Sequence, residues 1–536
     1  MKRRDLIKDL ALIPLAGGFM GSVFPVQSRA YTEISEQITA PENQDGEPGK
    51  PSKNIYDSLG VKSVINGRGT VTIIGACRML PEVERAMRAA TRHYVQLDEL
   101  MDGVAQRLAE LTGAEWGNVT TGATGALITG CAGIITGGNP DNLWKLPDLD
   151  GMKKEVIIPT YSWTAYESAV RGVGVKIIEV TTPGDLRGAL NDNTAMVLVL
   201  AGEHSEKGPL SINTISSIVK PAGIPILVDA AAEGLHVPNP HLSQGADLVA
   251  YSGGKYLNGP QCSGLLLGRK DLVKAAWITS APHHGFGRGY KVGREEIIGM
   301  LTAVEMWMKR DHADEIKKWT SRLEYIASKL KDIPGVDVQI QQPRGRSNPS
   351  PDLKVQWDTS KISLSGYDVE NLLWDDTPRV AVSGAGSFLP FPPNMQPNIL
   401  INSSQLETGE EKIIAERVFK ILSEPPVINK NMISPAFNIT GEWNLEMIFV
   451  ASRAKQKFIL MQEGNNLSGM HYANYASRPL TGSLSGDKLM VRSSYTVQGV
   501  RLNFEFAGVV KKDEIEGQVS MGEYGTAQWK AKRAGK

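Results

Sequence analysis

The sequence predicts an α/β fold: a doubly wound, mainly parallel sheet with a smaller α+β lobe, followed by a C-terminal antiparallel β domain. The first part is predicted because short apolar runs rich in β-branched residues alternate with amphipathic helical segments over residues 55–320. The last part is predicted because, from residue 440 on, strand-like segments follow one another through Gly, Asn and Asp turns with no helical pattern between them.

Length and composition set the limits within which a function is sought. The chain has 536 residues, which suggests about three or four domains. Its 58 basic and 58 acidic side chains cancel, so no domain-wide positive field attracts nucleic acid or an anionic membrane. Cys77, Cys131 and Cys262 are scattered and form neither a disulfide framework nor a CxxC pair. We therefore expect no nucleic-acid partner and no bound metal.

Residues 1–30 predict a twin-arginine-type signal peptide. A basic stretch at residues 2–4 precedes an apolar segment at residues 10–26, and small residues that suit a signal peptidase follow at residues 28–30. The run RRDLIK, residues 3–8, resembles the twin-arginine consensus. We expect a periplasmic or otherwise exported protein that makes no membrane contact once the signal is removed. A basic helix start on a cytoplasmic protein is the alternative.

Composition shifts divide the rest of the chain into five segments. A polar stretch rich in Pro and Gly predicts a linker over residues 31–54. We expect the large α/β domain over residues 55–320 and the smaller lobe over residues 321–424. A Pro-rich linker, residues 425–439, precedes the β domain of residues 440–536, which we expect to be a small barrel or sandwich. Its expected role is structural or oligomerising, with ligand binding in its mouth as the alternative.

Hydrophobic periodicity places the main elements. Helices are predicted over residues 81–93, 98–112, 295–331 and 409–422. Buried strands are predicted over residues 155–158, 175–180, 195–200, 225–228 and 247–251.

Lys255 is the first candidate for chemistry. It follows a predicted strand inside a turn that contains Gly253, Gly254 and Gly259, where a planar ligand can approach the backbone closely. A lysine amine that is partly desolvated loses its proton more readily and becomes a nucleophile toward an aldehyde cofactor. A surface lysine in a loop is the simpler alternative.

Two further elements lie at predicted strand ends. Asp229 ends the apolar run PILVD, and ligands bind at the carboxyl ends of strands in open α/β sheets. A carboxylate there can keep a ring nitrogen protonated, although a helix cap would also place Asp after a strand. Thr121, Gly122 and Ala123 lie where a strand passes into a helix through small residues, which predicts a phosphate-binding turn.

A phosphate-binding turn, a strand-end Asp and then a lysine, in this order, resemble the fold-type I enzymes that depend on pyridoxal 5'-phosphate (PLP), over about residues 57–425. VINGRGTVTIIGACRMLPEVERAM, LAELTGAEWGNVTTGATGAL and SGGKYLNGPQCSGLLLGRKDLVKAA are similar to the selenocysteine synthase (seryl-tRNA selenium transferase)-like branch, which is aminotransferase class V-like and includes sugar-acid ammonia-lyases. The element Asn258-Gly259-Pro260-Gln261 is its most distinctive match.

The resemblance implies roles for particular residues. Lys255 would hold PLP as a Schiff base, Asp229 would bind the ring nitrogen, and Ser252 would add a hydroxyl to the phosphate site. Within Tyr161-Ser162-Trp163, we expect Trp163 to stack on the ring, with core packing as the alternative. His204 follows a predicted strand and is expected to line the cofactor face as a catalytic residue, or to be a capped or solvated histidine.

A glycine-rich loop supplies candidate substrate-binding residues. Arg288 and Lys291 lie among glycines that suggest a mobile lid, and they are expected to hold a substrate carboxylate or phosphate. His283 and His284 in the same loop are candidate acid/base groups. The small lobe shows no clear equivalent of the carboxylate-binding arginine of fold-type I aminotransferases, and Arg379 is the nearest alternative.

The resemblance implies a PLP-dependent lyase, of the ammonia-lyase or dehydratase kind, that acts on an amino acid or amino-sugar acid. Selenium transfer to seryl-tRNA is disfavoured by the export signal, the neutral charge and the lack of a separate N-terminal RNA-binding domain. An aminotransferase and a non-catalytic PLP-fold binding protein remain alternatives. Relatives of this kind are dimers or larger, so the resemblance also implies a homodimer or larger homo-oligomer.

Overall fold

The computed structural model describes residues 55–384, 396–426, 432–473, 476–497 and 500–535. The predicted signal peptide and first linker lie outside the described residues. The chain divides into a short N-terminal unit, Met1–Ser63, and a large unit, Val64–Lys536, which contains every element discussed below.

A seven-stranded sheet forms the centre of the large domain. Its strand order is β2-β8-β7-β6-β5-β3-β4. The strands are β2 (Trp116–Thr121), β3 (Glu155–Pro159), β4 (Lys176–Val180), β5 (Thr194–Leu200), β6 (Ile226–Asp229), β7 (Leu248–Ser252) and β8 (Ser263–Gly268). Strands β3 to β7 pair in parallel, whereas β8 pairs antiparallel with both β7 and β2. The predicted doubly wound, mainly parallel sheet is therefore confirmed.

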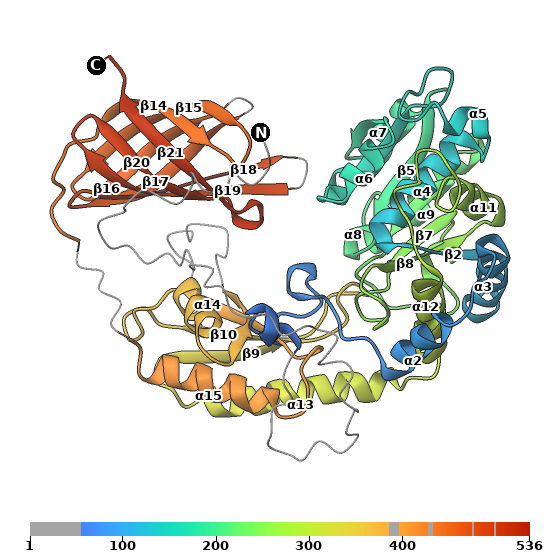
Figure 1. Ribbon diagram of the computed structural model, residues 1–536, viewed down its shortest axis with the longest axis horizontal. Helices are drawn as coiled ribbons and strands as arrows, with labels where there is room; N and C mark the ends of the chain where they lie inside the picture. The colour runs from blue at the N-terminus through green and yellow to red at the C-terminus, as the bar shows by residue number, and fades with distance from the viewer. Residues whose placement is uncertain (1–54, 385–395, 427–431, 474–475, 498–499, 536) are drawn as a thin grey trace, which may run out of the picture. The chain divides into compact units, whose positions relative to one another are not determined.

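Helices cover both faces of this sheet (Figure 1). Strand β5 is buried along its length because alternate residues enter two separate cores, Val197 and Val199 on one face and Met196 and Leu198 on the other. The first core includes residues of α3 (Leu97–Thr112), α7 (Pro183–Ala189), α9 (Ile212–Val219) and α12 (Arg294–Trp307). The second includes residues of α4 (Gly122–Thr136), α6 (Glu167–Arg171) and α11 (Lys270–Ile278). The remaining α-helices of this domain in the described part of the chain are α2 (Pro81–Ala90), α5 (Pro140–Leu143), α8 (Glu203–Lys207) and α10 (Pro240–Ser243).

The smaller lobe packs three helices against an antiparallel sheet of order β12-β13-β10-β9. Its elements are α13 (His312–Leu330), β9 (Val336–Gln341), β10 (Asp352–Trp357), α14 (Gly366–Asp375), β12 (Ser383–Gly384), β13 (Asn398–Asn402) and α15 (Glu410–Ser423). A separate parallel pair joins β1 (Val64–Asn66) to β11 (Arg379–Ala381). Figure 1 shows α13 and α15 side by side, and they pack on each other.

The long helical segment predicted over residues 295–331 is confirmed, and it consists of two helices, α12 and α13. The break coincides with a local helix-start signal. The side chain of Asp311 accepts a hydrogen bond from the backbone N–H of Asp314 and caps α13. An N-cap of this kind satisfies a free N–H group of the new helix, so it stabilises a restart in place of a continuous helix.

The C-terminal domain is a closed antiparallel barrel (Figure 1). Of the two architectures predicted from the sequence, a barrel and a sandwich, the barrel is confirmed. Its strands are β14 (Gly441–Ile448), β15 (Arg453–Glu463), β16 (Asn466–Tyr472), β17 (Ser477–Ser485), β18 (Lys488–Val497), β19 (Val500–Lys511), β20 (Glu514–Ser520) and β21 (Thr526–Arg533). The barrel closes because β14 pairs with both β15 and β21. Phe458, Phe506, Trp443 and Trp529 fill its interior. Within the described residues, no helix combines the length and the apolarity needed to cross a membrane.

Candidate active site

Three strand ends of the large sheet bring the predicted cofactor residues to one edge. β6 ends at Asp229, β7 ends at Ser252, and β2 ends at Thr121 where α4 begins. Ser252 lies opposite Gly264 of β8, and Gly264 lies opposite Thr120 of β2. Strand β8 alone therefore lies between the end of β2, which leads into the turn at Thr121, and the end of β7, which leads to Lys255. Gly264, the β8 residue at this position, has no side chain to stand between them.

The turn after β7 is held tightly, and this fixes the position of Lys255. A Cβ atom on Gly254 would lie only 2.8 Å from the Cα atom of Gln261, so no larger residue fits. The backbone N–H of Gly253 donates to the carbonyl of Ser263, and that of Gly259 donates to the carbonyl of Gly253. These bonds close the turn upon itself and orient Lys255 above the strand ends.

Burial shifts the pKa values of Asp229 and the partly buried Lys255 in opposite directions. Asp229 is 6% exposed, and its Oδ1 accepts a hydrogen bond of 3.1 Å from the backbone N–H of Ala231. Burial raises the pKa of Asp229, while the Ala231 hydrogen bond and the charge of Lys255 act in the other direction. Burial also lowers the pKa of Lys255, opposed by the charge of Asp229. The amine is therefore more easily deprotonated than a solvated lysine, as a nucleophile requires.

The start of α4 has the features of an anion site. Thr121 precedes the helix, its side chain makes no capping bond, and its hydroxyl is buried without a hydrogen-bond partner among the described residues. Gly122 has a φ of +65°, which favours glycine. A Cβ atom on Gly264 would lie 2.7 Å from the backbone nitrogen of Ala123, so the glycine keeps the N–H groups clear. An orphaned hydroxyl and a free helix start fit a phosphate group.

The two aromatic residues of the segment after β3, Tyr161 and Trp163, make different contacts. The Tyr161 and His204 rings stack with centres 5.6 Å apart and planes at 24°, and Tyr161 donates to the carbonyl of Leu210 at 2.7 Å. The Trp163 indole instead donates to Oε2 of Glu179 at 2.5 Å. Glu179 belongs to the edge strand β4, so Trp163 is held on the side of the sheet away from β6 and β7.

The glycine-rich loop with Arg288 and Lys291 makes its contacts elsewhere. His283 lies 3.1 Å from Oδ1 of Asp98 at the start of α3 and packs edge-on against Trp277. Arg288 and Lys291 are exposed, as is His284. Among the described residues, no hydrogen bond, ion pair or ring contact joins this loop to the side chains of Lys255 or Asp229.

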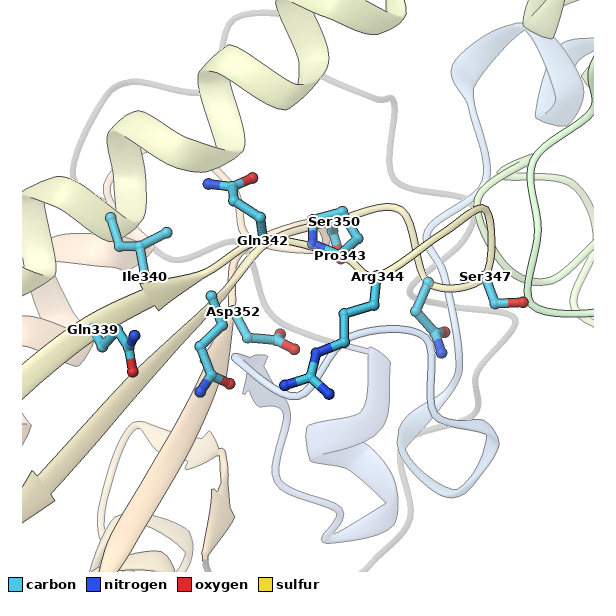
Figure 2. Close-up of a pocket in the computed structure, with 10 residues that line it drawn as sticks. Gln339, Ile340, Gln342, Pro343, Arg344, Ser347, Ser350 and Asp352 are labelled. Carbon is cyan, nitrogen blue, oxygen red and sulfur yellow. The ribbon is translucent and has the colours of Figure 1, made fainter. Parts of the chain in front are cut away.

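A polar pocket of about 470 Å³, which the sequence did not reveal, opens in the small lobe (Figure 2). It lies around the loop between β9 and β10, from which Arg344 extends, and includes Ser350 and Asp352. The hydroxyls of Ser350 and Tyr256 are 2.9 Å apart, so the pocket adjoins the residue that follows Lys255.

Among the described residues that line this pocket, the polar side chains of Ser350 and Asp352 are hydrogen-bonded, whereas the guanidinium of Arg344 is not. Asn402 donates to Ser350 at 2.7 Å and to Asp352 at 2.8 Å, while burial raises the pKa of Asp352. Arg344 is exposed and has no hydrogen-bond or ion-pair partner among the described residues. Arg379, the alternative expected from the sequence, donates to the carbonyl of Trp374 at 2.9 Å and stacks on its ring.

Comparison with known proteins agrees with this geometry. The Aminotransferase class-V family model matches residues 163–350. The chain is 32% identical to D-glucosaminate-6-phosphate ammonia lyase of Salmonella typhimurium over 328 residues, which cover 59% of this chain and 86% of the relative. It is 30% identical to 5'-C-glycyluridine monooxygenase-decarboxylase of a Streptomyces species, covering 54% and 73%. It is 27% identical to L-seryl-tRNA(Sec) selenium transferase of Proteus mirabilis, covering 46% and 57%.

A solved structure gives the same result. The structure of a D-glucosaminate-6-phosphate ammonia-lyase superposes with a TM-score of 0.60 at 28% identity, covering 70% of this chain and all of the other. The matched region and the residues at the sheet edge fit PLP: a lysine with a lowered pKa, a buried carboxylate and an open anion site. The chain therefore belongs to the D-glucosaminate-6-phosphate ammonia lyase family of PLP-dependent fold-type I enzymes.

Proposed function

We propose that this enzyme is an ammonia lyase that acts on an amino-sugar acid, or a hydroxylated amino acid, with a second acidic group. The observation that carries the proposal is the polar pocket with the exposed guanidinium of Arg344, whose lining residue Ser350 contacts Tyr256, the residue after Lys255. The similarity to an enzyme whose substrate is named as D-glucosaminate 6-phosphate supports the same class of substrate.

In this proposal the sheet edge holds the cofactor. Thr121, Gly122, Ala123 and Ser252 would bind the phosphate, and Asp229 would bind the ring nitrogen. PLP, when bound, supplies an electron sink for the substrate carbon. Within the segment after β3, the stacked Tyr161–His204 pair is better placed than Trp163 to cover the cofactor, because Trp163 is engaged with Glu179.

The substrate steps fall to side chains of this chain. The Lys255 amine, which burial keeps easily deprotonated, takes the proton from the α-carbon. Arg344 holds the acidic end of the substrate through charge-assisted hydrogen bonds. The small-lobe loop that carries Arg344 continues to Asn348, whose N–H donates to the carbonyl of Ala232 beyond β6, and this bond anchors the loop to the large domain.

We propose a homodimer or larger assembly for the same enzyme. The side chains of Arg288 and Lys291 are exposed and make no hydrogen bond or ion pair among the described residues, so they can reach the substrate of a neighbouring subunit. Light scattering of the purified protein tests this: a monomeric mass would exclude any such contribution.

A substrate panel tests the reaction class. PLP-loaded protein is given amino-sugar acids with and without a terminal phosphate, and hydroxylated amino acids, with no added keto acid. We expect equal amounts of ammonia and keto acid, with preference for the phosphorylated compounds. Conversion of an added keto acid to its amino acid without free ammonia would identify an aminotransferase. Selenium incorporation into seryl-tRNA would identify a selenium transferase, and no turnover of any substrate would identify a binding protein.

We propose export by the twin-arginine route for this enzyme, on the basis of the RRDLIK run and the apolar segment that follows it. A fusion of residues 1–31 to a folded reporter tests this in a bacterium with an active twin-arginine system. The reporter should reach the periplasm, and replacement of Arg3 and Arg4 by Lys should retain it in the cytoplasm. A double replacement that is exported as well as the parent would rule out this route.

A further inference from the structure

The barrel interior contains an arginine that has no counter-ion among the described residues. Arg478 of β17 is 2% exposed, and neither its Nε nor its Nη1 has a hydrogen-bond partner within the described part of the chain. The guanidinium lies 4.3 Å from the ring centres of both Tyr495 and Phe504. Aromatic faces stabilise a cation, but they do not satisfy its N–H donors. A buried arginine with open donors is costly, so its presence in a packed barrel needs an explanation.

The neighbouring polar groups supply no negative charge. The imidazole of His471 is buried between the Ser493 hydroxyl at 2.8 Å and Oε1 of Gln456 at 2.7 Å. Burial lowers the pKa of His471 to about 3, and the charge of Arg478 adds to this effect, so the imidazole is neutral. Among the ion pairs of the described residues, none involves Arg478. The open donors of Arg478 therefore remain available to a ligand.

An apolar cavity of about 320 Å³ lies at the same end of the barrel. Its lining residues are Phe449, Leu502, Asn503, Phe504, Met521 and Tyr524. Phe504 is shared: its ring forms a wall of the cavity and also contacts the guanidinium of Arg478. The buried Oδ1 of Asn503 is a second polar atom without a partner among the described residues.

The size and chemistry of this cavity define a ligand class. The interior of an eight-stranded barrel is either filled by side chains or holds one small ligand. Here aromatic side chains fill the middle of the barrel, and the cavity lies at one end. Small-molecule sites are mostly apolar with a few placed polar groups. Arg478 does not itself line the cavity but lies against Phe504, one of its walls. A cation one ring away from an apolar cavity matches a molecule with an apolar body and a single anionic head. We propose that the barrel binds a small organic acid, with its apolar body in the cavity and its carboxylate on the guanidinium of Arg478.

Titration calorimetry on the full-length, PLP-loaded protein tests the proposal. The probes are hexanoate, octanoate and decanoate, each below its micelle concentration, with the alcohol of the same chain length as neutral counterpart. We expect at least one acid to bind, and its alcohol to bind about 10- to 100-fold more weakly because the charge-assisted hydrogen bonds are lost. Arg478→Met should weaken acid binding by a similar factor.

The control is Arg492→Met. Arg492 lies on β18 of the same barrel, is partly exposed and pairs with Glu505 at 3.2 Å, so its loss should leave acid binding unchanged. If Arg478→Met does not fold, Leu502→Trp keeps the arginine and fills the cavity, and it should abolish acid binding. Equal binding of acid and alcohol, no binding of any acid, or unchanged binding in the Arg478→Met or Leu502→Trp variant would overturn the proposal. Ammonia release does not enter this test.

Discussion

The large domain and the barrel each bury a basic side chain, but they treat its charge in opposite ways. Lys255 lies beside Asp229, whose charge partly offsets the burial of the amine. Arg478 lies between two aromatic rings with no acidic partner among the described residues. A lysine beside a carboxylate is prepared for proton transfer, whereas an arginine without an acidic partner stays charged and prepares a pocket for an anion.

The largest expected effect is the loss of ammonia release when Lys255 is replaced. Lys255→Ala should lower ammonia release by about 1,000-fold or more, because the proton-transferring amine and the covalent attachment of PLP are both lost. Steady-state rates at saturating PLP measure this. Lys274→Ala is the matched control, since Lys274 is half-exposed and pairs with Asp102 at 3.5 Å on the surface. Comparable activity of the two variants would contradict a catalytic role for Lys255.

Asp229→Asn separates electrostatics from local structure. Asn keeps an oxygen that can accept the Ala231 hydrogen bond but lacks the charge. Turnover should fall by about 10- to 100-fold, because the ring nitrogen loses its charged partner. Undiminished turnover would show that Asp229 only caps the turn.

Asp229→Asn should also shift the pH dependence of PLP uptake by the apoprotein, and the shift is toward lower pH. The charge of Asp229 raises the pKa of Lys255, so its removal lowers that pKa and makes the neutral amine available at lower pH. The midpoint of the uptake rate against pH should lie below 10.5 in the parent apoprotein and lower still in Asp229→Asn. A midpoint that rises in the variant would mean that the two groups are not coupled in this way.

Arg344→Ala tests the substrate pocket and should act on binding more than on chemistry. We expect the KM of a phosphorylated amino-sugar acid to rise about 10-fold with little change in kcat. Arg379→Ala is the control, because its guanidinium is engaged with Trp374 and should not affect KM. A fall in kcat without a change in KM would move Arg344 from substrate binding to the chemical step.

The smallest expected effect is on the stability of the barrel when Arg478 is replaced. In the absence of ligand, Arg478→Met should stabilise the barrel by about 1 kcal/mol, because an apolar side chain replaces a buried charge without a partner. Hydrogen exchange of peptides from β17 and β18 measures this. Destabilisation of the barrel would show that Arg478 is a structural residue.

The sequence predicted most of the large domain because its signals are local. The run at residues 195–200 gave β5 to within one residue, and the helix expected over residues 98–112 is α3. Strand direction is not local: the apolar run of β8 gives no sign that it pairs antiparallel with β7. The N-cap Asp311 was present as a signal but was overridden by the long helical periodicity on either side of it.

The candidate site divides in the same way. Lys255, Asp229 and Thr121 were visible because each lies at a strand end next to small residues. Arg344 was not singled out because no motif marks the segment of residues 339–352 that lines its pocket. The contacts that connect this segment to other parts of the chain, from Ser350 to Tyr256 and Asn402, join residues that are distant in sequence. Arg478 carried a signal that was available: it shares the strand alternation of Leu480 and Leu484, which are both buried. A basic residue in phase with core residues predicts a buried charge.

The proposed chemistry requires Lys255 to be the residue that carries PLP. Borohydride reduction of the purified, PLP-loaded protein, followed by peptide mapping, tests this most directly. We predict one modified peptide, with PLP on Lys255, and none in the Lys255→Ala variant. A modification on another lysine, or no modification in a protein that releases ammonia, would contradict the assignment of the active site to this edge of the sheet.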